Sequence, residues 1–265
     1  MDPADRPGRA ENARLTRTWG VHLEPWQWGL LAAAAFLTGL SKTGIPGLGV
    51  LTVALFANAM EARSSTGALL PLLICGDVFG VALYRKHASW PHLWKLFPSV
   101  VIGVIAGYFA LGRLDNAQVE RMIGGILLVM IALHLWHQRQ PRDDEGIPHT
   151  WWAAALAGSL AGFTTMVANA AGPVMILYLL AVGLPKLAFV GTGAWFFMLV
   201  NVFKVPFSAN LGLINRESLL LDALLVIPMI PGALLGPVLL RRLNQVWFER
   251  IALGLTLIAV LRLLW

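Results

Sequence analysis

Apolar residues fall into ten blocks along the chain, separated by short polar or glycine-rich stretches. A helix needs about 20 apolar residues to cross a bilayer, and most of the blocks approach or reach that length. The pattern predicts helices over residues 27–41, 46–60, 64–84, 93–112, 119–137, 151–166, 169–183, 187–207, 218–240 and 247–264. We therefore expect an all-α polytopic membrane protein with five segments in each half.

Two glycine-rich breaks lie at matching places in the two halves. The first is residues 39–47, with sequence GLSKTGIPG, and the second is residues 162–173, with sequence GFTTMVANAAGP. Unwound backbone is tolerated within a bilayer only where protein or a water-filled cavity satisfies its polar groups. Paired interruptions in two repeats point to the binding site of a transporter. We therefore expect the two breaks to meet near the bilayer centre.

Composition supports a membrane location. The chain is 57% hydrophobic and 13% charged, with a mean hydropathy of +0.69, whereas soluble domains average about 25% charged residues. Most tryptophans and basic residues lie near segment ends, as expected beside lipid headgroups. The net charge of +6 therefore indicates contact with anionic lipid and not with nucleic acid. Cys75 is the single cysteine, which excludes an intrachain disulfide.

The chain divides into a tail, two repeats and a linker. Residues 1–25 form an arginine-containing tail without a signal-peptide pattern, which we expect in the cytoplasm. The repeats are residues 26–137 and 151–265, and the polar linker is 138–150. An offset of 129 aligns Arg113 with Arg242 and Glu120 with Glu249. An offset of 123 aligns residues 39 and 162, and 49 and 172, which are all glycines.

The first two segments of each half are predicted to be short. Fifteen helical residues rise only about 22 Å, less than the hydrocarbon thickness of about 30 Å. We interpret each pair as a re-entrant hairpin that precedes three transmembrane helices. The odd number of crossings inverts the second half relative to the first. The alternative is one kinked, tilted span in place of each hairpin, which gives parallel repeats.

Three ionisable residues inside the predicted segments are candidates for function. Lys42 lies in the first break, Asp77 near the middle of segment 64–84, and Lys204 late in segment 187–207. Either lysine could instead reach an interface with its flexible stem. Asp77 fits proton coupling or a structural ion pair equally well.

The other ionisable residues are weaker candidates for function. We expect Asp222, in the first turn of its predicted helix, to stabilise the helix dipole. His134 and His137 lie near an interface and lack the further ligands that a metal site needs. No metal site and no cofactor are predicted.

Neutral polar residues complete the predicted site. Asn169 and Asn201 are amides in apolar surroundings, and Thr43, Thr164 and Thr165 offer hydroxyls near the breaks. Each hydroxyl could also bond to its own helix backbone. The second arm of each hairpin would direct its free N–H groups to the same place. Together with Lys42 and Lys204, these donors predict a site for a small anion.

The ordered set of motifs resembles the TauE/SafE sulfite exporter family of bacterial inner-membrane transporters. The resemblance covers nearly the whole chain after about Trp26. It is carried by residues 39–49 (GLSKTGIPGLG), 76–77 (GD), 162–165 (GFTT), Asn169, 172–173 (GP), 191–197 (GTGAWFF) and 201–206 (NVFKVP). It implies export of sulfite or small organosulfonates.

We therefore interpret the chain as an ion-coupled secondary transporter for a small sulfur-containing anion. Its partners would be the anion, a coupling ion such as a proton, membrane lipid and, as a further option, copies of itself. A passive anion channel with the same fold is the first alternative. An integral membrane enzyme is the second, although no nucleophile, acid and base appear at recognisable spacing. A purely structural membrane partner would not need polar breaks in both halves.

Overall fold

The computed structural model describes residues 23–60, 62–111, 113 and 151–264, without the side chains of residues 62–64 and 256–264. Its helices are α2 (Pro25–Thr43), α3 (Gly49–Ala59), α4 (Ala62–Tyr84), the short 3-10 helix η1 (Arg85–His87), α5 (Trp90–Leu111), α7 (Trp151–Ala168), α8 (Ala171–Ala181), α9 (Lys186–Asn210), α10 (Arg216–Arg242) and α11 (Gln245–Leu264). The predicted helix 119–137, the linker 138–150 and most of the tail 1–25 lie outside the described residues.

The predicted all-helical fold is confirmed for the part of the chain that the structure describes. Each of the other nine predicted segments coincides with one observed helix. Five helices are long and apolar enough to cross a membrane, namely α4 with η1, α5, α7, α9 and α10. The first arms, α2 and α7, reach 19 and 18 residues and are longer than predicted. The second arms, α3 and α8, are short, with 11 residues each.

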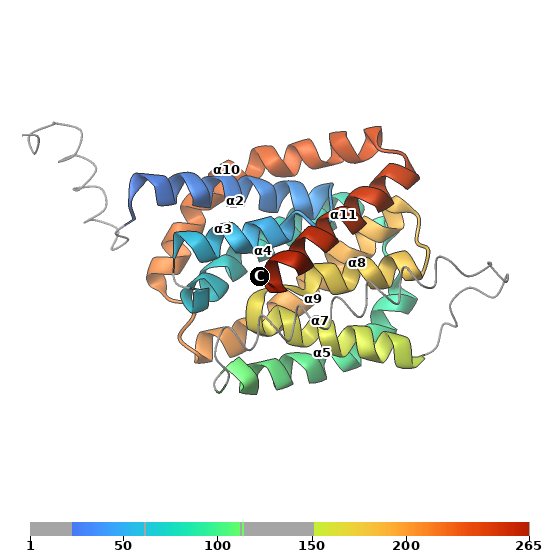
Figure 1. Ribbon diagram of the computed structural model, residues 1–265, viewed down its shortest axis with the longest axis horizontal. Helices are drawn as coiled ribbons and strands as arrows, with labels where there is room; N and C mark the ends of the chain where they lie inside the picture. The colour runs from blue at the N-terminus through green and yellow to red at the C-terminus, as the bar shows by residue number, and fades with distance from the viewer. Residues whose placement is uncertain (1–22, 61, 112, 114–150, 265) are drawn as a thin grey trace, which may run out of the picture.

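The helices form a bundle with two outer pairs. Figure 1 shows α2 and α10 along one edge and α5 and α7 along the opposite edge, with the other helices between them. One apolar core joins α5, α7, α8 and α9. A second joins α2, α4 and α10. Met166, Val167 and Ala171 of the second break belong to the first of these cores.

The helices α2 and α3 form an antiparallel hairpin. At its open end, the side-chain amide of Gln27 donates to the carbonyl of Ala59 over 2.7 Å. Nearer the turn, the hydroxyl of Thr38 lies 3.4 Å from that of Thr52. The chain reverses between the two helices, where Gly47 has a φ of +97° that glycine adopts without strain. Residues 27–60 are therefore a hairpin and not a single kinked helix.

Glycines bring the outer helix pairs into backbone contact. A Cβ atom at Gly103 of α5 would collide with the carbonyl of Ser159 and lie 2.9 Å from the nitrogen of Phe163, both in α7. In the other pair, a Cβ atom at residue 232 of α10 would collide with the carbonyl of residue 36 and lie 3.1 Å from the nitrogen of residue 40, both in α2. The offset of 129 relates residue 103 to residue 232, and the offset of 123 relates residues 36 and 40 to residues 159 and 163. The two helix pairs therefore touch at positions that the sequence repeat relates to each other.

The central helices α4 and α9 cross in opposite directions. Gly67, near the start of α4, packs against Leu213, just beyond the end of α9. Gly191, near the start of α9, packs against the carbonyl of Tyr84 at the end of α4. An offset of 124 relates Gly67 to Gly191. The two central helices therefore run antiparallel where they meet.

Candidate functional site

The two breaks line one internal cavity of about 90 Å³. Its polar lining consists of Ser41, Lys42, Thr165, Asn169 and Asn201. The rest comes mainly from apolar residues of α3, α8 and the first half of α9. The prediction that the breaks meet in space is thus confirmed, while their depth in the bilayer stays a prediction.

Lys42 is held in the last turn of α2 by a carboxylate and an aromatic ring. Its Nζ lies 2.7 Å from Oδ1 of Asp77, whose side chain is fully buried. The same Nζ lies 4.1 Å from the centre of the Phe197 ring, a distance at which the ring face attracts a cation. Of the two roles considered for Asp77, the structure therefore shows the ion pair.

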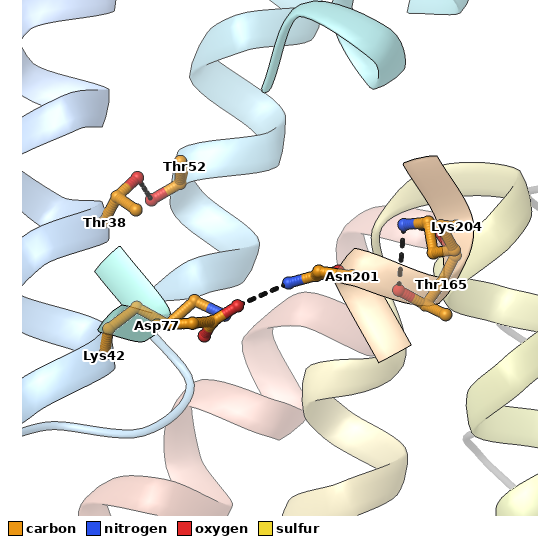
Figure 2. A network of polar contacts seen from close by, with 7 residues as sticks. All are labelled: Thr38, Lys42, Thr52, Asp77, Thr165, Asn201 and Lys204. Atoms are coloured by element: carbon orange, nitrogen blue, oxygen red, sulfur yellow. Dashed lines mark hydrogen bonds and ion pairs between the residues drawn. The ribbon is translucent and has the colours of Figure 1, made fainter. Parts of the chain in front are cut away.

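The side chains of Asp77 and Asn201 meet where α4 crosses α9. Figure 2 shows the amide of Asn201 donating to Oδ2 of Asp77, over 2.7 Å. The two residues are 124 positions apart, the same separation as Gly67 and Gly191. Oδ1 of Asn201 is buried and has no hydrogen-bond partner among the described residues. Because buried polar atoms are normally paired, this oxygen is an acceptor available to a bound molecule.

Lys204 forms hydrogen bonds to the second break from outside the cavity. Its Nζ donates to the carbonyl of Thr165 over 2.7 Å, to the Thr165 hydroxyl over 3.2 Å and to Oδ1 of Asn169 over 2.6 Å. All three partners are neutral. The residue is 1% exposed and lies six positions before the end of α9. It therefore does not reach an interface with its stem, and it also does not line the cavity.

Asn169 links three parts of the site. Its backbone has a φ of +52°, in the left-handed region that asparagine tolerates better than most residues. Besides accepting from Lys204, its amide donates to the backbone carbonyl of Thr66 in α4 over 2.9 Å. Asn169 thereby joins the second break to both central helices.

Thr43 and Thr164 bond to helix backbone and do not line the cavity. The hydroxyl of Thr43 contacts the carbonyls of Gly39 and Ala233 at 2.9 and 2.8 Å. That of Thr164 donates to the carbonyl of Leu160 over 2.8 Å. These are the backbone bonds that the sequence left open as the alternative role of each hydroxyl.

Asp222 does not lie in the first turn of its helix. Helix α10 begins at Arg216 and is capped by Asn215, so Asp222 is its seventh residue and Glu217 is the acidic residue of the first turn. The Asp222 side chain is 4% exposed, and both carboxyl oxygens lack hydrogen-bond partners among the described residues. The helix dipole therefore does not explain its position.

Two contributors to the site were not predicted from the sequence. Phe197 lies in a recognised motif, but nothing in the pattern showed that its ring faces Lys42. Thr66 contributes a backbone carbonyl, which leaves no signal in the residue type. The first contact depends on how α9 packs against α2, and the second on how the second break packs against α4.

The charges of the site favour a small anion. Lys42 and Lys204 stand against the single carboxylate of Asp77, which leaves one net positive charge. A buried charge is costly unless it is paired, so an anion in the cavity would restore neutrality. Within the described residues, no cluster of three or more His, Cys, Asp or Glu side chains could hold a metal ion.

The helical bundle, its spans and its charged internal cavity together define a polytopic membrane protein of the transporter class. The chain belongs to the sulfite exporter TauE/SafE family, whose model matches residues 31–263. No curated protein and no solved structure matches the chain. Family membership implies a membrane exporter of sulfite or a related anion.

Proposed function

We propose that this protein is a secondary transporter that exports a short-chain organosulfonate across the bacterial inner membrane. The observation that carries the proposal is the cavity lined by both breaks, with Lys42 in its polar lining and Lys204 bonded to Thr165 and Asn169 of that lining. Lys42 would contact the sulfonate, and Thr165, Asn169 and Asn201 would supply neutral polar contacts. Lys204 would contribute charge through its bonds to the second break.

The lining favours an organosulfonate over inorganic sulfite. Val50, Val53, Met175, Ile176 and Phe197 form an apolar wall opposite the polar end. Inorganic sulfite has no hydrocarbon group that could pack against these apolar residues. The cavity measures about 90 Å³ and has a polar and an apolar side. A sulfonate with one or two carbon atoms fits both the size and the two-sided lining.

An inverted repeat would allow this site to open to either side. Helices α4 and α9 are equivalent by the offset of 124, are long enough to span a membrane, and run antiparallel. A two-fold axis that relates two such helices lies in the membrane plane. Inverted repeats commonly alternate access by moving one repeat or bundle against the other. Asp77, at the crossing, is the proposed coupling residue.

Transport by purified protein in liposomes tests the proposal. We expect proton-driven accumulation of radiolabelled ethanesulfonate or methanesulfonate, with unlabelled sulfite competing more weakly and sulfate weakest. Flux that stops when the anion gradient is dissipated would indicate a channel instead. If none of these anions binds or moves, the proposed substrate class is wrong.

Asp77→Asn tests the coupling role separately. We expect this variant to bind ethanesulfonate but to lose the dependence of transport on the pH gradient, because it cannot exchange a proton. Transport with an unchanged pH dependence would remove Asp77 from coupling while leaving the substrate assignment intact.

A further inference from the structure

Most of the cavity lining that the two central helices supply comes from the stretch of α9 before Asn201, and α4 contributes Leu73 alone, close to the crossing of Asp77 and Asn201. Towards the start of α9 the cavity is lined by Val190, Gly193 and Ala194. The offset of 124 relates these positions to residues 66, 69 and 70 on α4, which do not line the cavity. Leu69 and Leu70 are 1% and 0% exposed, respectively. The cavity therefore extends along residues 190–194 of α9, whereas the corresponding residues 66–70 of α4 are packed against other side chains.

A hydrogen bond closes off this stretch of α4. Asn169 donates to the carbonyl of Thr66 over 2.9 Å, while Lys204 fixes its Oδ1 over 2.6 Å. The equivalents of Asn169 and Thr66 on the open side are Pro46 and Val190, and both line the cavity. Neither of those two side chains carries a polar atom. The closing bond thus exists on one side of the two-fold axis only.

We propose that Asn169 gates a second half-channel along α4, through which the same small anion reaches the site from the opposite membrane face. Thr66, Leu69 and Leu70 would line this half-channel when it is open. The inference rests on the proposed function, because it takes the anion and the inverted repeat from it.

Opening requires only that the second hairpin moves away from α4. The bond from Asn169 to Thr66 is the polar contact that joins the break to the start of α4. Lys204 lies on α9 and can keep its contacts to Thr165 and Asn169 during this motion. The first hairpin would then close on Val190, as the two-fold relation requires. The central pair of Asp77 and Asn201 lies at the crossing in both states.

Single cysteines on the two halves test the proposal. The native Cys75 is first replaced by serine, and Ala194→Cys or Leu70→Cys is then introduced, since these positions are equivalent. We expect an impermeant, negatively charged methanethiosulfonate to label Ala194→Cys from one membrane face and Leu70→Cys, more slowly, from the other. Leu69→Cys serves as the second reporter if Leu70→Cys does not fold.

The gate is tested by Asn169→Gly in each reporter. Glycine keeps the left-handed backbone without strain and removes only the side-chain bonds. We expect labelling at residue 70 to rise about fivefold, the shift that loss of one net hydrogen bond produces, and labelling at residue 194 to fall. The matched control is Asn58→Ala, which removes an exposed amide bonded to Ala54 and should change neither rate.

The outcomes separate this inference from the proposed function. If both α4 reporters stay unlabelled from either face, or if Asn169→Gly leaves their labelling unchanged, Asn169 is not a gate, even where ethanesulfonate binds and is transported. If labelling follows the expected pattern but ethanesulfonate neither binds nor moves, the gate stands and the substrate assignment fails.

Discussion

The two lysines of the site, Lys42 and Lys204, are stabilised by different kinds of partner. Asp77 neutralises Lys42 over 2.7 Å, whereas Lys204 relies on neutral oxygens. A bound sulfonate would lie beside Lys42 and compete with Asp77 for its ammonium group. In the proposed function, the carboxylate would give up its place next to Lys42 to the sulfonate when the sulfonate binds.

This competition leads to a prediction for neutral variants of the pair. Lys42→Gln alone should lower the stability of the protein by about 3–5 kcal/mol, because it leaves the buried Asp77 carboxylate without its counter-charge. The double variant Lys42→Gln with Asp77→Asn should recover most of that loss. Thermal unfolding in detergent measures both changes.

Anion affinity gives the second readout of the same variants. The stable double variant should bind ethanesulfonate about tenfold to a hundredfold more weakly than the native protein, the loss expected for one charge-assisted contact. Native affinity in the double variant would show that the anion is bound by amides and backbone alone.

The hydroxyls show what the sequence could not resolve at the residue scale. Thr43, Thr164 and Thr165 lie in equally polar breaks, yet only Thr165 faces the cavity. The direction of each hydroxyl depends on a neighbouring helix, as Thr43 shows by its contact with the carbonyl of Ala233 in α10. A pattern of residue types contains no information about that neighbour.

At the scale of elements, the breaks were predictable because they interrupt otherwise uniform apolar blocks. Glycine and proline at positions 44, 46 and 47 end one helix and turn the chain before the next begins at Gly49. The lengths of α2 and α7 were underestimated, because helix continues through Lys42 and Thr43 and through Val167 and Ala168. Small polar residues do not end a helix when tertiary contacts satisfy them.

The glycine contacts of the outer pairs give a prediction for helix packing. Gly103→Leu and Gly232→Leu should each lower the stability of the protein by at least about 1–3 kcal/mol, because the added side chain meets backbone that cannot move aside. Thermal unfolding of the purified variants measures the change.

Gly29→Ala is the matched control for these two variants. A Cβ atom at Gly29 in α2 has no neighbour within 4 Å, and alanine favours helix over glycine by about 1 kcal/mol. This variant should be neutral or slightly stabilising. Equal stability of all three variants would contradict a packing role for Gly103 and Gly232.

At the scale of the whole molecule, the repeat was only partly visible in the sequence. Shared Glu-Arg pairs marked the predicted final segments of the two halves in the sequence. The central helices share few identities, so their offset of 124 emerged only from contacts such as those of Gly67 and Gly191. Asp77 and Asn201 differ in type, so nothing in the sequence indicated that the proposed repeat relates them.

The orientation of the two halves gives the last prediction, which concerns Lys86 and Asn210. These residues are exposed, lie at the ends of α4 and α9 and are equivalent by the offset of 124. In inverted repeats they lie on opposite membrane faces, whereas parallel repeats place them on the same face.

With Cys75 replaced by serine, Lys86→Cys and Asn210→Cys should therefore react with an impermeant maleimide from opposite sides. Labelling of intact cells and of inverted membrane vesicles measures this directly, and full labelling after detergent solubilisation is the control that both thiols are reactive. If both cysteines react in the same preparation, the two halves are parallel. The cavity could then not open to alternate membrane faces by the two repeats taking each other's conformation.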